Sequence, residues 1–259
     1  MLRPRIIPCL LIRGGGLVKT LQFDQPKYVG DPINAVRIFN EKEVDELIVL
    51  DIDATVENRE PDYGLIKNLA AECRMPLCYG GGVTTADQIQ NIISLGVEKV
   101  AVSSAAIKDP ELISRAAKRV GKQSIVVVMD VKKTGLLRHY EILIHNGKVK
   151  TGLDPVVFAI KAAQMGAGEI VVNSIDRDGT MTGYDIDLVS KIQDAVALPV
   201  TALGGAGSLD DIANLIRQVG VSGAAAGSLF VFKGKYRAVL INYPYSEDKN
   251  RLFQSVEVK

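Results

Sequence analysis

Two glycine-rich segments contain the residues of this sequence that are best suited to bind a ligand. Gly81 and Gly82 follow one apolar run, and Gly204 and Gly205 follow another, 123 residues later. Backbone N–H groups beside glycine, together with the start of a helix, form good phosphate sites. We therefore predict two phosphate-binding turns. Glycines that only let the chain reverse direction would give the same pattern.

Small residues follow the next apolar run in both halves of the chain. Ser103 and Ser104 extend the first turn, and Gly227 and Ser228 extend the second. In a barrel of parallel strands, the turns after the last two strands are the usual phosphate site. Two such turns facing each other suit a small molecule that is phosphorylated at both ends.

The elements that must position these turns alternate between short apolar runs and segments with helical periodicity. The runs lack polar alternation, as expected for parallel strands buried on both faces, and cover residues 6–11, 46–52, 76–79, 99–103, 124–130, 169–174, 199–203 and 222–226. Helix starts are marked by aspartate before proline, or by capping boxes, at Asp31, Asp109, Asp154, Thr85 and Ser208. An open doubly wound sheet would show a GxGxxG turn, which Gly14–Gly16 does not provide. The pattern predicts an α/β protein with a single (β/α)8 barrel.

The repeat also predicts how the barrel is organised. Residues 46–49 (ELIV) and 169–172 (EIVV) are related by the same 123-residue shift as the glycine turns. We therefore expect two similar half-barrels. Residues 1–232 are assigned to the barrel, and residues 233–259 to a last helix and a C-terminal tail of the same domain.

Composition excludes several classes of function. With 31 Lys and Arg against 30 Asp and Glu, the chain has no charge excess that would favour nucleic acid or a membrane surface. Three cysteines without CxxC spacing predict reduced thiols and a cytoplasmic protein. The apolar stretch 6–12 is too short to span a membrane. Two histidines without a third ligand nearby predict no metal site, and no cofactor is expected.

Short motifs spread over residues 3–232 match those of a known family in order. They include 5–10 (RIIPCL), 30–32 (GDP), 80–82 (GGG), 109–113 (DPELI), 176–180 (DRDGT) and 204–207 (GGAG). In this the chain resembles HisF, the cyclase subunit of imidazole glycerol phosphate synthase. The resemblance implies catalytic roles for Asp130, Lys19 and Asp178. It also adds Gly179 to the phosphate-binding candidates.

The resemblance further implies a source of ammonia. A separate HisH-like glutaminase docks at the N-terminal face of the barrel, and ammonia passes through the barrel core. At the C-terminal face of the standard enzyme it reacts with a phosphoribulosyl formimino intermediate, and two carboxylates act as acid and base. The family's ring of charged residues at the barrel entrance corresponds to Arg5, Glu46, Lys99 and Glu169.

This ring can be interpreted in two ways. Two cations and two anions neutralise one another and leave a polar gate for a small neutral molecule. Alternatively, they form a structural salt-bridge network that closes the barrel. Glu98 and Gln123 lie near the same face and are candidate glutaminase contacts, unless they are ordinary solvated residues.

The match fails at the opposite end of the barrel. Leu11 stands where the family keeps its second catalytic carboxylate, and within the repeat it corresponds to Asp130. General acid–base catalysis contributes a factor of about 10² to 10⁴ per group, and leucine can neither donate nor accept a proton. Other departures at this end are Ser103, Ser104, Asn173 and Leu203.

Two functions fit this combination. In the first, the barrel relays ammonia from the glutaminase to another acceptor, through a third protein at the C-terminal mouth. HisF-like proteins with altered catalytic residues occur in pathways that amidate sugars of bacterial surface polysaccharides such as O-antigen, alongside an ATP-dependent amidotransferase. The alternative is an ordinary cyclase of histidine biosynthesis in which Asp130 and water suffice. A barrel isomerase of the sister family is disfavoured, because it needs two carboxylates and no charged gate.

Overall fold

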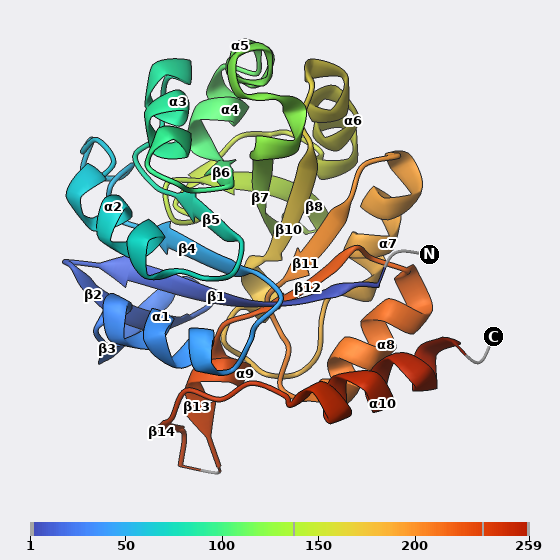
Figure 1. Ribbon diagram of the computed structural model, residues 1–259. Coiled ribbons are helices and arrows are strands. Elements are labelled where there is room, and N and C mark those ends of the chain that lie inside the picture. The colour runs from blue at the N-terminus through green and yellow to red at the C-terminus, as the bar shows by residue number, and fades with distance from the viewer. Residues whose placement is uncertain (1–2, 137, 235, 258–259) are drawn as a thin grey trace.

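Eight parallel strands form a closed barrel in the computed structural model, which describes residues 3–136, 138–234 and 236–257 (Figure 1). The strands are β1 (Arg5–Arg13), β4 (Leu47–Asp51), β5 (Leu77–Gly80), β6 (Lys99–Val102), β7 (Ile125–Thr134), β10 (Glu169–Ser174), β11 (Val200–Leu203) and β12 (Gly223–Ala226). Each pairs with the next, and β12 pairs with β1 to close the ring. The predicted (β/α)8 barrel is therefore confirmed.

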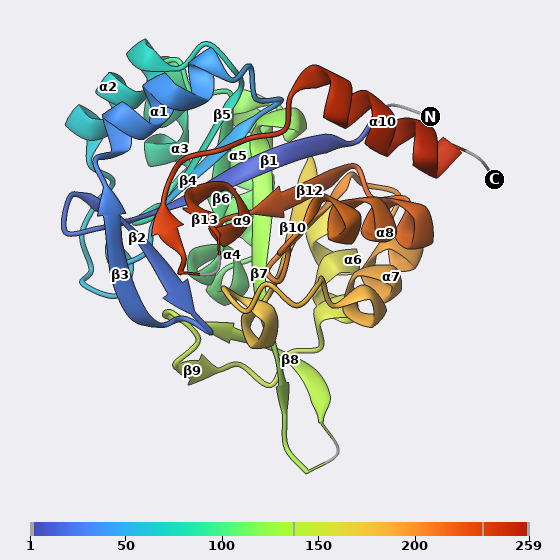
Figure 2. The same cartoon turned by 90° about the horizontal axis from the view of Figure 1, so that it is seen from below.

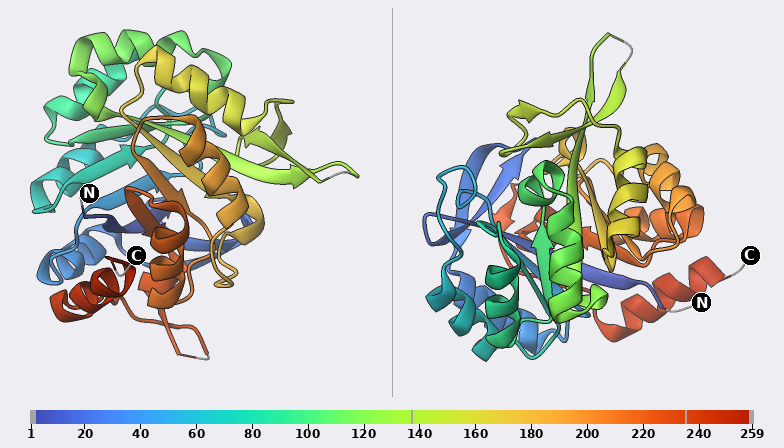
Figure 3. Two further views of the ribbon diagram at one scale, coloured as in Figure 1. Left: turned by 90° about the vertical axis from the view of Figure 1, so that its right-hand side faces the viewer. Right: turned by 90° about the horizontal axis from the view of Figure 1, so that it is seen from above.

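Helices surround the barrel on its outside (Figure 3). Those that connect successive barrel strands are α1 (Pro32–Glu41), α2 (Tyr63–Glu72), α3 (Ala86–Ser94), α5 (Glu111–Val120), α6 (Pro155–Met165), α7 (Ile186–Ala195) and α8 (Leu209–Val219). Two short helices, α4 (Ser104–Lys108) and α9 (Ser228–Val231), follow the fourth strand of each half. This correspondence agrees with the internal repeat. No helix among the described residues is long and apolar enough to cross a membrane.

Most helix starts follow the sequence signals. The predicted caps at Asp31, Asp154, Thr85 and Ser208 are all present, the last two as complete capping boxes. The predicted cap at Asp109 is wrong, because α5 begins at Glu111 with Pro110 in the cap position and no side-chain cap bond. The Asp109 carboxylate instead accepts a hydrogen bond from Arg115 Nη2 at 2.6 Å.

Three hairpins are added to the barrel, and the sequence indicates only the turn of the second one, at residues 145–148 (HNGK) (Figure 2). They consist of β2 (Gly16–Leu21) with β3 (Asp24–Gly30), β8 (His139–Ile144) with β9 (Val149–Lys150), and β13 (Phe232–Lys233) with β14 (Ala238–Val239). The first two continue from the C-terminal ends of β1 and β7, to which β2 and β8 pair. The third lies beside β3, where Lys27 Nζ is 5.2 Å from the centre of the Phe232 ring.

Two apolar layers form the core. One lies between the strands and the helices, and the other fills the inside of the barrel. The inner layer is lined by Ile7, Cys9, Ile48, Cys78, Ala101, Val126, Val128, Val171, Leu203 and Ala225. This layer separates the two ends of the barrel at which the candidate residues lie.

Candidate functional site

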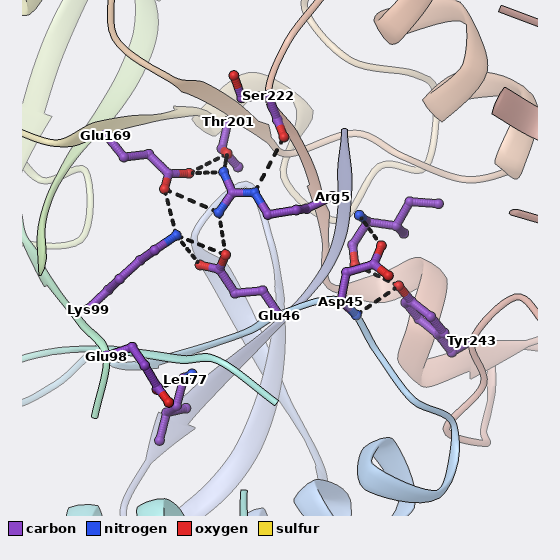
Figure 4. Close-up of polar contacts among 11 residues, drawn as sticks. Arg5, Asp45, Glu46, Leu77, Glu98, Lys99, Glu169, Thr201, Ser222 and Tyr243 are labelled. Carbon is purple, nitrogen blue, oxygen red and sulfur yellow. Dashed lines mark hydrogen bonds and ion pairs between the residues drawn. The ribbon is translucent and has the colours of Figure 1, made fainter. Parts of the chain in front are cut away.

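The four predicted gate residues form a ring of alternating charge at the N-terminal ends of the strands (Figure 4). Lys99 Nζ lies 2.9 Å from a carboxylate oxygen of Glu46 and 2.9 Å from one of Glu169. Arg5 donates to Glu169 at 2.8 Å and also to Glu46. Each cation therefore contacts both anions, and the structure brings all four predicted residues together.

Opposite charges keep Glu169 and Lys99 ionised despite their burial. The side chains of Glu46 and Glu169 are 4% and 6% exposed. Burial alone would raise the pKa of Glu169, but Arg5 and Lys99 outweigh it and hold this pKa below its ordinary value. Burial would likewise lower the pKa of Lys99, and the two glutamates raise it instead. The ring contains two positive and two negative charges, as both a gate and a structural seal require.

A C-terminal segment braces the strand starts that carry this ring. The helix α10 (Ser246–Glu257) packs beside α8 (Figure 2). Ahead of it, the Tyr243 hydroxyl donates to the carbonyl of Ile6 at 2.8 Å. Lys249 Nζ donates to Asp45 Oδ1 at 2.8 Å, and Asp45 Oδ2 accepts from the Ile6 amide at 2.9 Å. Because Ile6 and Asp45 are the chain neighbours of Arg5 and Glu46, these contacts help to fix the ring, and the sequence did not indicate them.

The Tyr243→Phe variant tests this bracing. Loss of the buried hydroxyl leaves the Ile6 carbonyl without that donor, so we expect a loss of about 1–2 kcal/mol in the free energy of unfolding. Urea unfolding followed by circular dichroism measures it. The matched control is Tyr245→Phe, since Tyr245 is 76% exposed and should lose almost nothing. Equal unfolding midpoints for both variants would contradict the bracing role.

The two predicted partner contacts lie on the surface at this end of the barrel. Glu98 precedes β6 and Gln123 precedes β7, and both side chains are exposed. Glu98 Oε2 also accepts from the Leu77 amide at 2.7 Å, which gives it a local structural role. Both remain accessible to a partner at this face.

A cavity of about 390 Å³ opens at the other end of the barrel, where the strands end. Its lining combines the end of β1, both glycine turns and the hairpin β2–β3. All of the mouth candidates but one line it: Lys19, Gly81, Ser103, Ser104, Asp130, Asp178, Gly179, Gly204, Gly205, Gly227 and Ser228. Leu11, Leu50 and Leu203 form an apolar part of the same wall.

The exception is Gly82. Its amide donates to Thr55 Oγ1 at 3.2 Å, so this N–H is not free for a phosphate. A Cβ at this position would lie 2.6 Å from the carbonyl oxygen of Arg59. The residue therefore serves close packing of a neighbouring loop.

Packing also explains other glycines of the two turns. A Cβ at Gly81 would lie 2.4 Å from the carbonyl oxygen of Asp51, and one at Gly205 would lie 2.2 Å from that of Gly183. Both have positive φ, +124° and +111°. Both glycines therefore also fit the alternative interpretation, in which they only let the chain reverse direction. Ser103 supports a ligand role, since its hydroxyl is buried at the cavity without a hydrogen-bond partner among the described residues.

The three catalytic candidates differ in what holds them. Asp178 Oδ2 accepts from Thr20 Oγ1 at 2.6 Å and from the Phe23 amide at 3.2 Å, so it anchors the hairpin β2–β3. Lys19, which lies on β2 and not in a loop, donates to the carbonyl of Cys9. Burial lowers the pKa of Lys19. Asp130, by contrast, accepts its hydrogen bond from a side chain, through Asn173 Nδ2, whereas Asp178 also accepts one from the backbone.

Asp130 has an unusual titration. Burial raises its pKa from 3.8 to about 6, and the Asp178 charge adds to this rise, while a 2.8 Å hydrogen bond from Asn173 Nδ2 opposes it. Its position beside β10 was predictable from the strand pattern, although β7 continues past it to Thr134 instead of ending there. Its pairing with Asn173 was not, because that contact depends on side-chain direction.

The raised pKa predicts a specific pH dependence of stability. Because the folded-state pKa of Asp130 lies above its unfolded value, ionisation weakens the fold as pH rises from about 4 to about 6. We expect the free energy of unfolding of Asp130→Asn, relative to that of the parent chain, to rise by about 2–3 kcal/mol between pH 4 and pH 7. Urea unfolding at several pH values measures this gain. The exposed Asp194→Asn is the control, and a difference that does not change with pH would contradict the shift.

Known proteins resemble this chain over almost its whole length. The family model described as histidine biosynthesis protein matches residues 5–237. A protein of Leptospira borgpetersenii, provisionally named imidazole glycerol phosphate synthase subunit HisF, is 59% identical over 98% of this chain and 100% of its own length. A Pseudomonas aeruginosa protein, provisionally named subunit hisF2, is 53% identical over 97% of this chain and 99% of its own length.

A relative that is named HisF without a provisional qualifier is less similar to this chain. The imidazole glycerol phosphate synthase subunit HisF of Alkaliphilus metalliredigens is 42% identical over 89% of this chain and 91% of its own length. The alignments at 53–59% identity leave only a few residues of this chain unmatched. They therefore include most of the C-terminal segment that braces the ring, whereas the family model ends before α10.

Proposed function

The chain belongs to the histidine biosynthesis protein family as a HisF-like protein, and from this premise we propose that it relays ammonia. Ammonia enters from a HisH-like glutaminase at the N-terminal face and leaves at the mouth cavity. It is used there to amidate a sugar of a bacterial surface polysaccharide. One observation carries the proposal: the charged ring is complete, while Leu11 fills the wall where the HisF resemblance requires a second catalytic carboxylate.

The interior through which the proposed relay must pass suits a neutral molecule. The interior above the ring is lined by aliphatic side chains such as Ile7, Val126 and Val171, each at most 2% exposed. Moving an ion through such surroundings is unfavourable, whereas an uncharged molecule of the size of water meets a much lower barrier. The path therefore favours ammonia over ammonium.

The mouth offers features that a third protein could contact. Leu136, at the tip of the hairpin β7–β8, is fully exposed, and Tyr236 is 90% exposed. Arg138, Lys148 and Lys150 are exposed on the hairpins that extend β7. These features support a partner with an acidic surface at this end. We assign that role to an ATP-dependent sugar amidotransferase, and a phosphorylated small molecule remains the ligand proposed for the glycine turns.

The ordinary cyclase is the second candidate function. Asp130, Lys19 and Asp178 lie in one cavity with the glycine turns, and this favours retained cyclase chemistry. The numbered name hisF2 of the Pseudomonas relative, by contrast, supports a role beside another HisF.

Complementation of a cyclase-deficient bacterium separates the two functions. The chain is co-expressed with a HisH-like glutaminase from its own genome, and the HisF of Alkaliphilus metalliredigens with its glutaminase is the positive control. The relay predicts no growth without histidine for this chain. Growth equal to the control overturns the relay. In the native host, deletion of the gene should remove amidated sugar from the surface polysaccharide, as measured by mass spectrometry, and a plasmid copy should restore it.

A further inference from the structure

The floor of the mouth cavity contains a buried oxygen without a hydrogen-bond partner in the described part of the chain. This oxygen is Asn173 Oδ1, on a side chain that is 6% exposed. The hydrogen bond from Asn173 Nδ2 to Asp130 fixes the amide, since the reversed amide would place two acceptor oxygens against each other. A buried acceptor without a donor costs about 1–3 kcal/mol. A ligand with an N–H or O–H group is therefore expected beside it.

The Asn173 side chain lines the mouth cavity beside the second glycine turn. A Cβ at Gly204 would lie 3.2 Å from Asn173 Oδ1, so a larger residue at this position would crowd the oxygen. Leu11 and Leu203 lie in the wall of the same cavity. Neither can donate a proton to the ligand or balance a charge on it. The Lys19 side chain, which lines the same cavity, donates to the carbonyl of Cys9.

We propose that Asn173 and Asp130 together bind neutral ammonia at the cavity floor immediately before its transfer. The inference rests on the proposed relay function and names the place where the relayed molecule stops. Ammonia has three N–H donors and one lone pair. It donates one N–H to Asn173 Oδ1 and another to the second carboxylate oxygen of Asp130.

This arrangement leaves the lone pair free for an acceptor at the mouth. An acid at position 11 could protonate that lone pair, and an ammonium ion has no lone pair with which to attack. Leu11 removes this competing proton transfer. Leu11 removes one group of the acid–base pair that the cyclase needs. In a relay, the same leucine keeps ammonia neutral and able to attack.

Nuclear magnetic resonance of the full chain, without glutaminase or acceptor, tests the site directly. In protein labelled with ¹⁵N-asparagine, the side-chain amide signal that disappears in Asn173→Leu belongs to Asn173. Ammonium chloride is added at pH 7 and at pH 9, with potassium chloride of equal ionic strength as the salt control. We expect a saturable shift of this signal that is larger at pH 9, where more of the added nitrogen is neutral ammonia.

A second signal is needed in the Asn173→Leu variant, because this variant lacks the Asn173 amide signal. The ¹³C signal of the Asp130 carboxyl should show the same saturable shift, and in Asn173→Leu its apparent affinity for ammonia should fall about tenfold, as for one lost hydrogen bond. The exposed Asn91→Leu is the control variant and should bind as the parent chain does. Absence of a saturable shift, an equal shift with potassium chloride, or equal shifts at both pH values each overturn the proposal.

The failure of this site is distinguishable from the failure of the relay. If ammonia does not bind and complementation is negative, the site at Asn173 is wrong while the proposed relay stands. If ammonia binds and the chain restores growth without histidine, the relay is wrong and the bound ammonia serves cyclase chemistry. The binding measurement thus decides the site, and complementation decides the function.

Discussion

Glu169→Gln is expected to lower the free energy of unfolding by about 2–4 kcal/mol at pH 7. The variant keeps the shape of the side chain but leaves Arg5 and Lys99 to share Glu46 alone. Removal of one member of a buried ion network leaves an uncompensated charge, and this effect reaches 3–5 kcal/mol for fully buried pairs. We expect a smaller value because the Arg5 and Lys99 side chains are 25% and 18% exposed and reach water.

The effect should depend on pH in a defined direction. The folded-state pKa of Glu169 lies below its ordinary value of 4.5, because Arg5 and Lys99 outweigh the effect of burial. A carboxylate with a depressed pKa stabilises the fold fully above the unfolded pKa, and this stabilisation is lost as pH falls through the folded one. The difference between parent and variant should therefore be constant from pH 7 to about 5 and shrink below pH 4.5. Urea unfolding at pH 7, 5 and 3.5 measures it.

Two further variants identify the cause. Glu98→Gln, at the same face, is the surface control and should change stability by less than about 0.5 kcal/mol. Adding Lys99→Met to Glu169→Gln removes the unpaired cation and should recover part of the loss. A stability of Glu169→Gln equal to that of the parent chain at pH 7 would show that the ring contributes little to the fold.

The barrel could be predicted because its signals are local and repeated. Each buried strand is a short apolar run, and the capping boxes at Thr85 and Ser208 mark two helices that are related by the repeat. The hairpin β2–β3 has no such signal. Five of the seven residues of β3 are exposed, so no apolar alternation distinguishes the strand from a loop. The same holds for the two-residue strands β9, β13 and β14.

The candidate site was predictable where it depends on strand ends. Parallel strands in a closed barrel place their first residues at one face and their last residues at the other. This rule is sufficient to bring Lys99 and Glu169 together at one end and Asp130 close to the glycine turns at the other.

The remaining contacts depend on packing between distant segments. Tyr243 reaches Ile6 across 237 positions because the chain ahead of α10 passes along the N-terminal face. No periodicity or spacing in the sequence encodes such a contact. The occupied amide of Gly82 is a similar case, since its partner Thr55 lies on a loop after another strand. Asn173 was recognised as a departure from the family, but its unpartnered oxygen becomes visible only when the direction of the amide is known.

The largest gain of activity is expected from Leu11→Asp. The variant places a carboxylate at the end of β1, in the wall of the cavity that already contains Asp130, Lys19 and Asp178. If the missing acid–base group is the main defect, formation of imidazole glycerol phosphate should rise by a factor of about 10² or more. The measurement is product formation with ammonium as the nitrogen source, so that no glutaminase is required.

Leu11→Asn is the matched control, because its amide has similar size and polarity but transfers no proton. Only the aspartate variant should gain turnover. A second carboxylate in the cavity should also raise the pKa of Asp130 further above 6, through repulsion between like charges. The activity of the variant should therefore show a pH profile with two ionisations. If the aspartate variant gains nothing, the loss of cyclase chemistry extends beyond Leu11 to Ser103, Ser104, Asn173 and Leu203. In that case Asn173, which hydrogen-bonds the remaining carboxylate, is the next position to exchange, and the whole C-terminal mouth has adapted to deliver ammonia.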